Sequence, residues 1–113
     1  MAAALLLGAG CDAGPGPEAS PAARARFIYE SNCATCHGPQ GAGDGISGGG
    51  LNPPRSFRDR EWQAEVDDAR IARVMVEGGE AVGLSPLMPP NPDLADEPAV
   101  VEELVKIVRG FGE

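Results

Sequence analysis

The sequence predicts an all-α fold of three main helices joined by long Gly- and Pro-rich connections. Three segments, at about 21–32, 67–77 and 96–109, combine helix-capping residues with apolar side chains at helical spacing. No stretch of useful length alternates apolar and polar residues, as a strand with one buried face would. Most of the 16 Gly and 11 Pro lie outside these segments, where they favour turns and loops.

The first helix is expected over 21–32. Ser20 suits the N-cap position, and a proline suits the first helical position because its missing N–H would have no partner there. No helix breaker follows before residue 32, so the helix leads directly into a cysteine-containing run. Its apolar face is expected to contain Ala23, Phe27 and Ile28.

The other two helices have clear boundaries. The second is expected to begin at Asp67 or Asp68 as N-cap and to stop at the glycine pair 78–79. Its apolar face contains Ile71, Val74 and Met75. The last helix is expected over 96–109, with acidic residues near its start, basic residues near its end and Gly110 just beyond it. Its apolar face contains Val101, Leu104, Val105 and Val108.

The chain has little material for a hydrophobic core. Its 113 residues suffice for one small domain. Only five of them are aromatic: Phe27, Tyr29, Phe57, Trp62 and Phe111. Domains of this size usually depend on disulfides, a metal or a cofactor, and three cysteines cannot form a framework of several bridges. The composition therefore predicts a bound group that completes the core.

The charge excludes one class of function. Nine Lys and Arg against 17 Asp and Glu give a formal net charge of -8. Nucleic-acid binding needs a basic surface that displaces counterions from phosphates, and the few basic residues here are scattered. We therefore expect no nucleic-acid partner. The acidic balance favours association with a basic partner surface, or simply solubility.

The N-terminus predicts export. The first ten residues are apolar, too short to span a bilayer, and similar to the apolar part of a secretory signal. Cys11 follows small residues, as in the processing site of bacterial lipoproteins; simple cleavage or an ordinary unpaired thiol are the alternatives. We expect a leader at 1–11, a flexible linker at 12–20 and one folded domain at 21–113. The expected location is the periplasm or the outer face of the cytoplasmic membrane, with Cys11 as the lipid tether.

The chemistry lies in the run Cys33-Ala34-Thr35-Cys36-His37. This C-x-x-C-H spacing is typical of c-type haem attachment, in which two thiols form thioethers with the porphyrin and the histidine binds iron. A thioredoxin-like pair would need a βαβ context, a zinc site would need further ligands, and a chance match is the third alternative. The only histidine of the chain stands where haem needs it. We therefore expect one haem c, covalently held by Cys33 and Cys36, with His37 as an iron ligand.

A methionine is the expected second axial ligand. Methionine at the sixth position raises the reduction potential and closes the iron to other ligands, which favours electron transfer. Met88 lies between prolines in a stretch that cannot be helical and that suits a loop over the haem face. Its alternative role is an apolar anchor of that loop. Met75 lies on an apolar helix face and is expected in the core, and Met1 belongs to the leader.

From Pro21 to Glu113 the chain resembles a class I cytochrome c of the short bacterial type. Tyr29 provides the aromatic residue four positions before the first cysteine. The C-x-x-C-H run continues into a glycine-rich loop that reaches Gly45, and a Pro-containing segment follows at 51–57. A helix, a glycine pair, a Met-Pro motif and a C-terminal helix complete the pattern in the family's order.

The resemblance implies roles for four further residues. In this family a proline carbonyl accepts the N–H of the axial histidine, and Pro53 or Pro54 matches that proline. Arg55 and Trp62 resemble residues that hydrogen-bond haem propionates; a surface arginine and a core tryptophan are the alternatives.

The resemblance also implies a particular packing of helices, with two departures in this chain. The first and last helices of the family cross nearly at right angles and enclose the haem together with the loops. The glycine often found at that crossing is Ala25 here. The aromatic residue often found in the last helix is replaced by Ile107, with Phe111 four residues further on. These departures concern the helix crossing and leave the haem motif intact.

The implied function is one-electron transfer between redox protein partners that dock transiently, by a monomer that is not an enzyme. One alternative is an electron-accepting subunit or tethered domain of a larger dehydrogenase or oxidase complex. A second is a five-coordinate haem that senses a gas or reduces peroxide, which would follow if Met88 does not bind iron.

Overall fold

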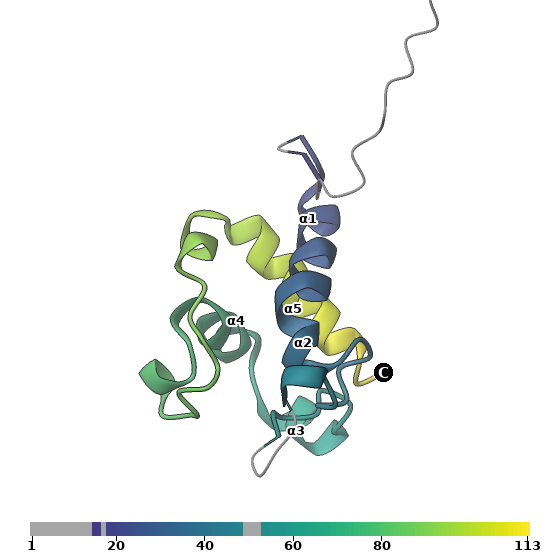
Figure 1. Cartoon of the computed structure of the whole chain (residues 1–113), viewed down its shortest axis with the longest axis vertical. Helices are drawn as coiled ribbons and strands as arrows, with labels where there is room; N and C mark the ends of the chain where they lie inside the picture. Colours follow the sequence, from purple (N-terminus) through teal and green to yellow (C-terminus); the bar gives the residue numbers. More distant parts are fainter. Residues whose placement is uncertain (1–14, 17, 49–52) are drawn as a thin grey trace, which may run out of the picture.

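The structure is a computed structural model that describes residues 15, 16, 18–48 and 53–113. The predicted leader with Cys11, part of the predicted linker and residues 49–52 lie outside these ranges. Within them every regular element is helical, which confirms the all-α prediction (Figure 1). The α-helices are α1 (Pro21–Ile28), α2 (Ala34–His37), α3 (Arg60–Glu65), α4 (Asp68–Glu77) and α5 (Pro98–Gly110). None of the helices in the described ranges is both long and apolar enough to cross a bilayer.

α1 begins as predicted and runs on into the cysteine motif. The Ser20 side chain accepts a hydrogen bond from the N–H of Ala23 at 3.1 Å. A π-helical turn, Tyr29–Cys33, joins α1 to α2. Within it the N–H of Ala34 bonds to the carbonyl of Tyr29, so this turn contains one residue more than an α-helical turn. The extra residue rotates the following Cys36 and His37 relative to the buried face of α1.

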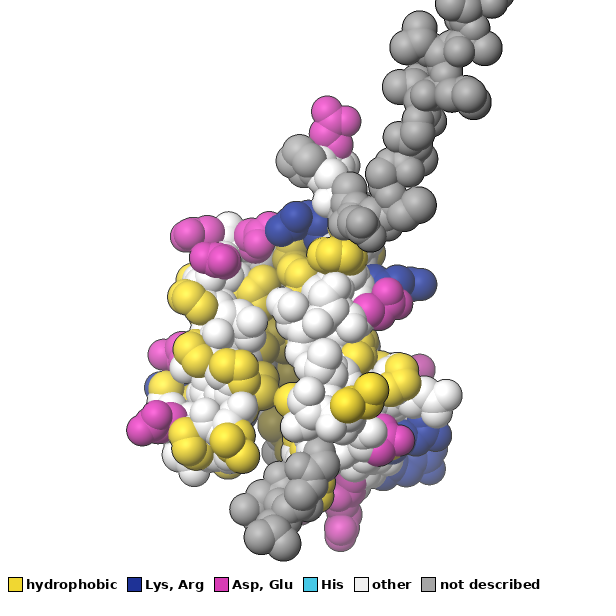
Figure 2. Space-filling model, in the orientation of Figure 1, with side chains coloured by type: hydrophobic (Ala, Val, Ile, Leu, Met, Phe, Trp, Pro, Cys, Tyr) yellow, Lys and Arg dark blue, Asp and Glu magenta, His cyan; other side chains and the backbone are white. Residues whose placement is uncertain are grey.

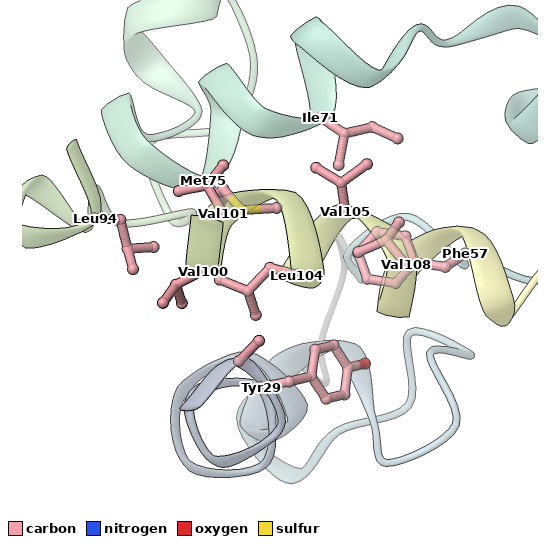
Figure 3. Close-up of a cluster of buried hydrophobic side chains, with 11 residues drawn as sticks. Tyr29, Phe57, Ile71, Met75, Leu94, Val100, Val101, Leu104, Val105 and Val108 are labelled. Atoms are coloured by element: carbon pink, nitrogen blue, oxygen red, sulfur yellow. The ribbon is translucent and has the colours of Figure 1, made fainter. Parts of the chain in front are cut away.

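The buried face of α1 differs from the prediction. Ala25 is 0% exposed and Tyr29 is buried, whereas Ala23 is exposed and Phe27 is 44% exposed. Of the three predicted residues, only Ile28 packs against the core, half-buried. α5 lies across α1 at this face, as the view along α1 in Figure 3 shows. The small side chain of Ala25 allows the two helices to approach closely there. The bulkier Phe27 would keep them apart, and it points away from the crossing.

α3 was not predicted, because six residues are too few to show a helical period. Asp59 caps it by accepting a hydrogen bond from the N–H of Trp62 at 3.2 Å. α4 follows the prediction: the Asp67 side chain accepts from the N–H of Arg70 at 2.7 Å, and Gly78 ends the helix.

α5 begins and ends slightly later than predicted. Residues 92–96 form a separate 3₁₀ turn, and α5 starts at Pro98. The ring of Pro98 disfavours a helical conformation at Glu97, so the helix cannot extend further back. Gly110 is the last helical residue rather than the residue beyond the end. Phe111 then reaches back to α1, with its ring centroid 5.2 Å from that of Tyr29.

The core lies between α1, α4 and α5 (Figure 3). Leu104 has the largest of the fully buried side chains, at 2% exposure. The predicted faces of α4 and α5 provide most of it. The buried side chains are Ala25, Tyr29, Phe57, Ile71, Met75, Leu94, Val100, Val101, Leu104, Val105 and Val108.

A polar clamp joins the end of α5 to the segment around α3. The Arg109 guanidinium donates to the carbonyls of Gln63 and Val66, both at 2.7 Å, and to Asp68 Oδ1 at 2.8 Å. The Gln63 side-chain amide in turn donates to the carbonyls of Phe57, at 2.7 Å, and Val108, at 2.9 Å. These bonds fix the irregular stretch before α3 relative to α5.

Replacing Leu104 by alanine tests the position of the core. We expect Leu104→Ala to lower the free energy of unfolding of the holoprotein by about 2–5 kcal/mol, because it leaves a cavity in place of the largest fully buried side chain. The matched control is Ile46→Ala at a fully exposed side chain, which should change that free energy by less than about 0.5 kcal/mol. Denaturant titration measures both, and equal effects of the two substitutions would contradict the packing described.

Candidate functional site

The cysteine motif forms a single half-buried turn at the end of the first helix. Cys33 closes the π-helical turn, while Cys36 and His37 lie in α2. Both cysteines are free thiols, and both are partly buried. Burial, with a smaller contribution from Cys36, raises the pKa of Cys33 to about 11, so its thiol is neutral near pH 7. Two thiols and an imidazole therefore lie within five consecutive residues of one helical turn.

The glycine-rich loop satisfies the carbonyl groups at the end of α2. The N–H of Gly43 donates to the carbonyl of His37 at 2.8 Å, and the N–H of Gly45 donates to the carbonyl of Cys36 at 3.0 Å. Gly43 has a φ of +78°, which favours glycine. A side chain at Gly45 would overlap the backbone of α2. The glycines are thus required where the loop folds back against the motif.

Tyr29 braces the same turn from its buried side. Its hydroxyl donates to the carbonyl of Gly38 at 2.7 Å and so spans the whole motif. Burial raises the pKa of Tyr29 well above its usual value, so the hydroxyl remains a donor across the accessible pH range. The spacing of Tyr29 from the first cysteine was the sequence signal for this residue.

The imidazole of His37 is held by two contacts. Nδ1 lies 3.4 Å from the carbonyl oxygen of Arg55, and the ring stacks on that of Phe57 with centroids 4.3 Å apart. Because a carbonyl can only accept, Nδ1 carries the proton in this contact and Nε2 keeps its lone pair for a metal. Burial lowers the pKa of His37, against the opposing effect of the Arg55 carbonyl, and so favours the neutral ligand form.

The carbonyl beside His37 corrects one expectation. The resemblance implied Pro53 or Pro54 as the acceptor, but the structure places the next residue, Arg55, in that position. The Pro54 carbonyl is directed instead toward Gly43, where an added side-chain carbon would lie only 2.7 Å from its oxygen. Pro53 is exposed.

The two residues expected at haem propionates occupy different environments. The Arg55 side chain is exposed and forms an ion pair with Asp59 at 3.4 Å. Trp62 is half-buried and packs against the core, with its ring centroid 5.5 Å from that of Phe57. The structure thus brings Arg55 and Trp62 into the neighbourhood of His37, the first through its backbone and the second through Phe57.

Met88 comes from a separate segment that is tied to the end of α4. The side chain is half-buried and packs against the core, and its carbonyl accepts from the N–H of Gly79 at 3.0 Å. The N–H of Asn91 donates to the carbonyl of Val76 at 3.0 Å. The side-chain amide of Asn91 donates to the carbonyl of Met75 at 2.8 Å. Met75 itself is buried in the core. The Met88 loop is therefore fixed on both sides of the methionine.

A furrow separates the turn that contains His37 from the segment that contains Met88. In Figures 1 and 2, α1 and α2 lie on one side of it, and α4 with the green segment 80–91 lies on the other. Hydrophobic side chains are visible inside the furrow (Figure 2). Within the described ranges, no three His, Cys, Asp or Glu side chains gather as a site for a simple metal ion.

These residues fit a covalently bound haem. The thiols of Cys33 and Cys36 are suited to thioether bonds, and Nε2 of His37 is available for iron. The apolar furrow suits the flat hydrophobic ring. A pair of thiols without the adjacent His37 would lack the nitrogen donor for iron.

Three residues that position the site were not predicted from the sequence to do so. Phe57 was named only as one of the five aromatic residues and within the matched segment 51–57, and its stacking on His37 joins residues 20 positions apart. Gln63 and Asn91 act through side-chain bonds to distant carbonyls, for which a single sequence gives no periodic signal. The prolines on either side of Asn91 were the only local indication of a constrained loop there.

Comparison with known proteins identifies the family. A family model described as cytochrome C oxidase, cbb3-type, subunit III, matches residues 20–109. Comparisons with curated proteins and with solved structures found no match. The matched range contains the cysteine motif, the Met88 segment and nearly all of α5. The chain belongs to this family of c-type cytochrome domains: it is a small class I cytochrome with the all-α cytochrome c fold, and its function is haem-based electron transfer.

Proposed function

We propose that the protein carries single electrons on one haem c that is bound to Cys33 and Cys36 and ligated by His37 and Met88. The observation that carries this proposal is the arrangement of the two ligand-bearing segments. The free Nε2 belongs to a turn on one side of the apolar furrow, and the Met88 segment is anchored on the other side.

The chain's own residues account for a simple electron-transfer mechanism. When bound, the haem supplies a reversible ferric–ferrous couple. His37 presents Nε2 while the Arg55 carbonyl accepts its Nδ1 proton, which keeps the imidazole in one tautomer. The Met88 thioether would be the second protein ligand of the haem iron, and Gly79 and Asn91 hold its loop in place. With His37 and Met88 both as ligands, the iron would be closed to a substrate, and this arrangement would favour an electron carrier over an enzyme.

We propose that the carrier is a monomer in the periplasm or on the outer face of the cytoplasmic membrane, and that it meets its redox partners in brief encounters. The net charge of -8 favours a partner with a basic surface. Leu84 and Leu87, both largely exposed in the segment that precedes Met88, provide apolar contact beside the ligand. A small apolar contact surrounded by charge is typical of transient complexes.

Replacing the two internal methionines separates the ligand from the core residue. We expect ferric Met88→Ala to lose the long-wavelength charge-transfer band that reports methionine–iron bonding, and its reduction potential to fall. Met75→Leu is the control, because it conserves volume in the core and should keep the band. Visible absorption spectra of the purified holoproteins measure both. A wild type without the band, or a Met88→Ala variant that retains it, would refute the ligation and favour a haem with another sixth ligand or none.

A second candidate function is an electron-accepting subunit of a larger redox complex. The observation in its favour is the family description, which names an oxidase subunit. The test is purification of the tagged native protein from gently solubilised membranes. Recovery with one partner complex in fixed stoichiometry would favour the subunit role, whereas recovery as a monomer would favour the free carrier.

We also propose that Cys11, outside the described residues, becomes the lipid-bearing first residue of the exported protein. The small residues before it and the Gly- and Pro-containing linker after it support this proposal. Intact-mass measurement of the protein from its native membrane should find a chain that starts at Cys11 with a diacylglyceryl group and an acyl chain. A mature chain with an unmodified Cys11, or with none, would refute the anchor.

A further inference from the structure

Four of the five aromatic residues form one connected cluster, which contacts the only histidine of the chain through Phe57. Phe57 lies at the centre: its ring stacks on the imidazole of His37, and its centroid is 5.5 Å from that of Trp62 and 6.4 Å from that of Phe111. Phe111 in turn contacts Tyr29. Phe27, on the exposed side of α1, is not part of this cluster. Because the chain has so few aromatic residues, the contact between Phe57 and His37 indicates that the imidazole has a specific support.

The distances show which contact restrains the imidazole more strongly. The Nδ1–oxygen distance to Arg55 is 3.4 Å, beyond the usual range of about 2.7–3.2 Å for a strong N–H···O bond. A bond of that length allows the ring to rotate about the Cβ–Cγ bond of His37. The Phe57 ring lies face to face with the imidazole, with centroids 4.3 Å apart and only 18° between the planes. Rotation of the imidazole would therefore bring its edge against the phenyl ring.

Phe57 is itself held firmly. Its side chain is buried, its N–H donates to the carbonyl of Gly41 at 2.7 Å, and its carbonyl accepts from Gln63 Nε2 at 2.7 Å. The same Gln63 amide also donates to the carbonyl of Val108 in α5. Through Gln63, the position of the phenyl ring is thus fixed relative to the long C-terminal helix.

We propose that Phe57 is a positioning residue that sets the plane of the His37 imidazole, and that Gln63 acts through Phe57. This inference rests on the proposed function, because it concerns His37 as an iron ligand. The orientation of a histidine imidazole bound to ferric haem contributes, together with that of the second ligand, to how the unpaired spin is distributed over the ring. Phe57 would therefore determine a magnetic and electronic property of the site without touching the iron.

The test uses the ferric holoprotein and compares Phe57→Leu with the wild type. Leucine keeps an apolar side chain of moderate size but removes the flat face against which the imidazole stacks. We expect the order or the spread of the four hyperfine-shifted haem-methyl resonances in the proton NMR spectrum to change, because the imidazole plane rotates. Phe27→Leu is the matched control, and its four resonances should keep the wild-type order and spread.

A second variant keeps the ring but loosens it, in case Phe57→Leu folds poorly. Gln63→Met conserves side-chain length and removes the bonds to the carbonyls of Phe57 and Val108. We expect a change of the haem-methyl pattern in the same sense as in Phe57→Leu, but smaller. Loss of thermal stability alone, with the wild-type methyl pattern in both variants, would overturn the inference, because it would show a merely structural role.

The outcomes separate this inference from the proposed function. If the wild type is low-spin and shows the methionine band, and the methyl pattern does not respond to either substitution, only the positioning role of Phe57 is refuted. If the wild type lacks covalent haem or the low-spin spectrum, the proposed ligation is refuted and the positioning role with it.

Discussion

The last carbonyl groups of α2 need hydrogen-bond donors, although no further helical turn follows to provide them. The way in which these carbonyls are paired determines the position of the haem-binding residues. The carbonyl groups of Cys36 and His37 accept hydrogen bonds from the glycine loop that follows them, and the Tyr29 hydroxyl bonds to Gly38 from the buried side. The thiols and the imidazole are consequently fixed to a rigid backbone. These few bonds therefore determine where a haem attached to this turn lies.

Two further clamps hold the elements on either side of the furrow. Gln63 and Arg109 join the segment before α3 to α5, and Asn91 joins the Met88 loop to the end of α4. Each clamp uses a side chain to satisfy backbone carbonyls that no regular element would pair. Four of the five aromatic side chains form one cluster that contacts His37 through Phe57, and the furrow leaves room for the haem to supply the remaining apolar surface. A small domain can be stable in this way because its cofactor is part of its core.

The sequence was informative where a local rule determines the structure. The caps at Ser20 and Asp67, the stop at Gly78 and the haem motif all follow from residues a few positions apart. The buried face of α1 was mispredicted from helical spacing because the closest helix crossing selected a small residue, Ala25, over a large one, and only the family resemblance placed Ala25 at that crossing. The acceptor for His37, the short α3 and the roles of Phe57, Gln63 and Asn91 depend on contacts between distant parts of the chain. A single sequence contains no period that would predict them.

Covalent attachment of a haem to Cys33 and Cys36 would explain both the cysteine motif and the small apolar content of the core. The most direct test is mass spectrometry of the protease fragment that contains residues 33–37, prepared from the protein as purified from its native host. We expect a fragment heavier by one haem, with neither cysteine accessible to alkylation. A fragment of unmodified mass, with free thiols or a disulfide between the two cysteines, would contradict it.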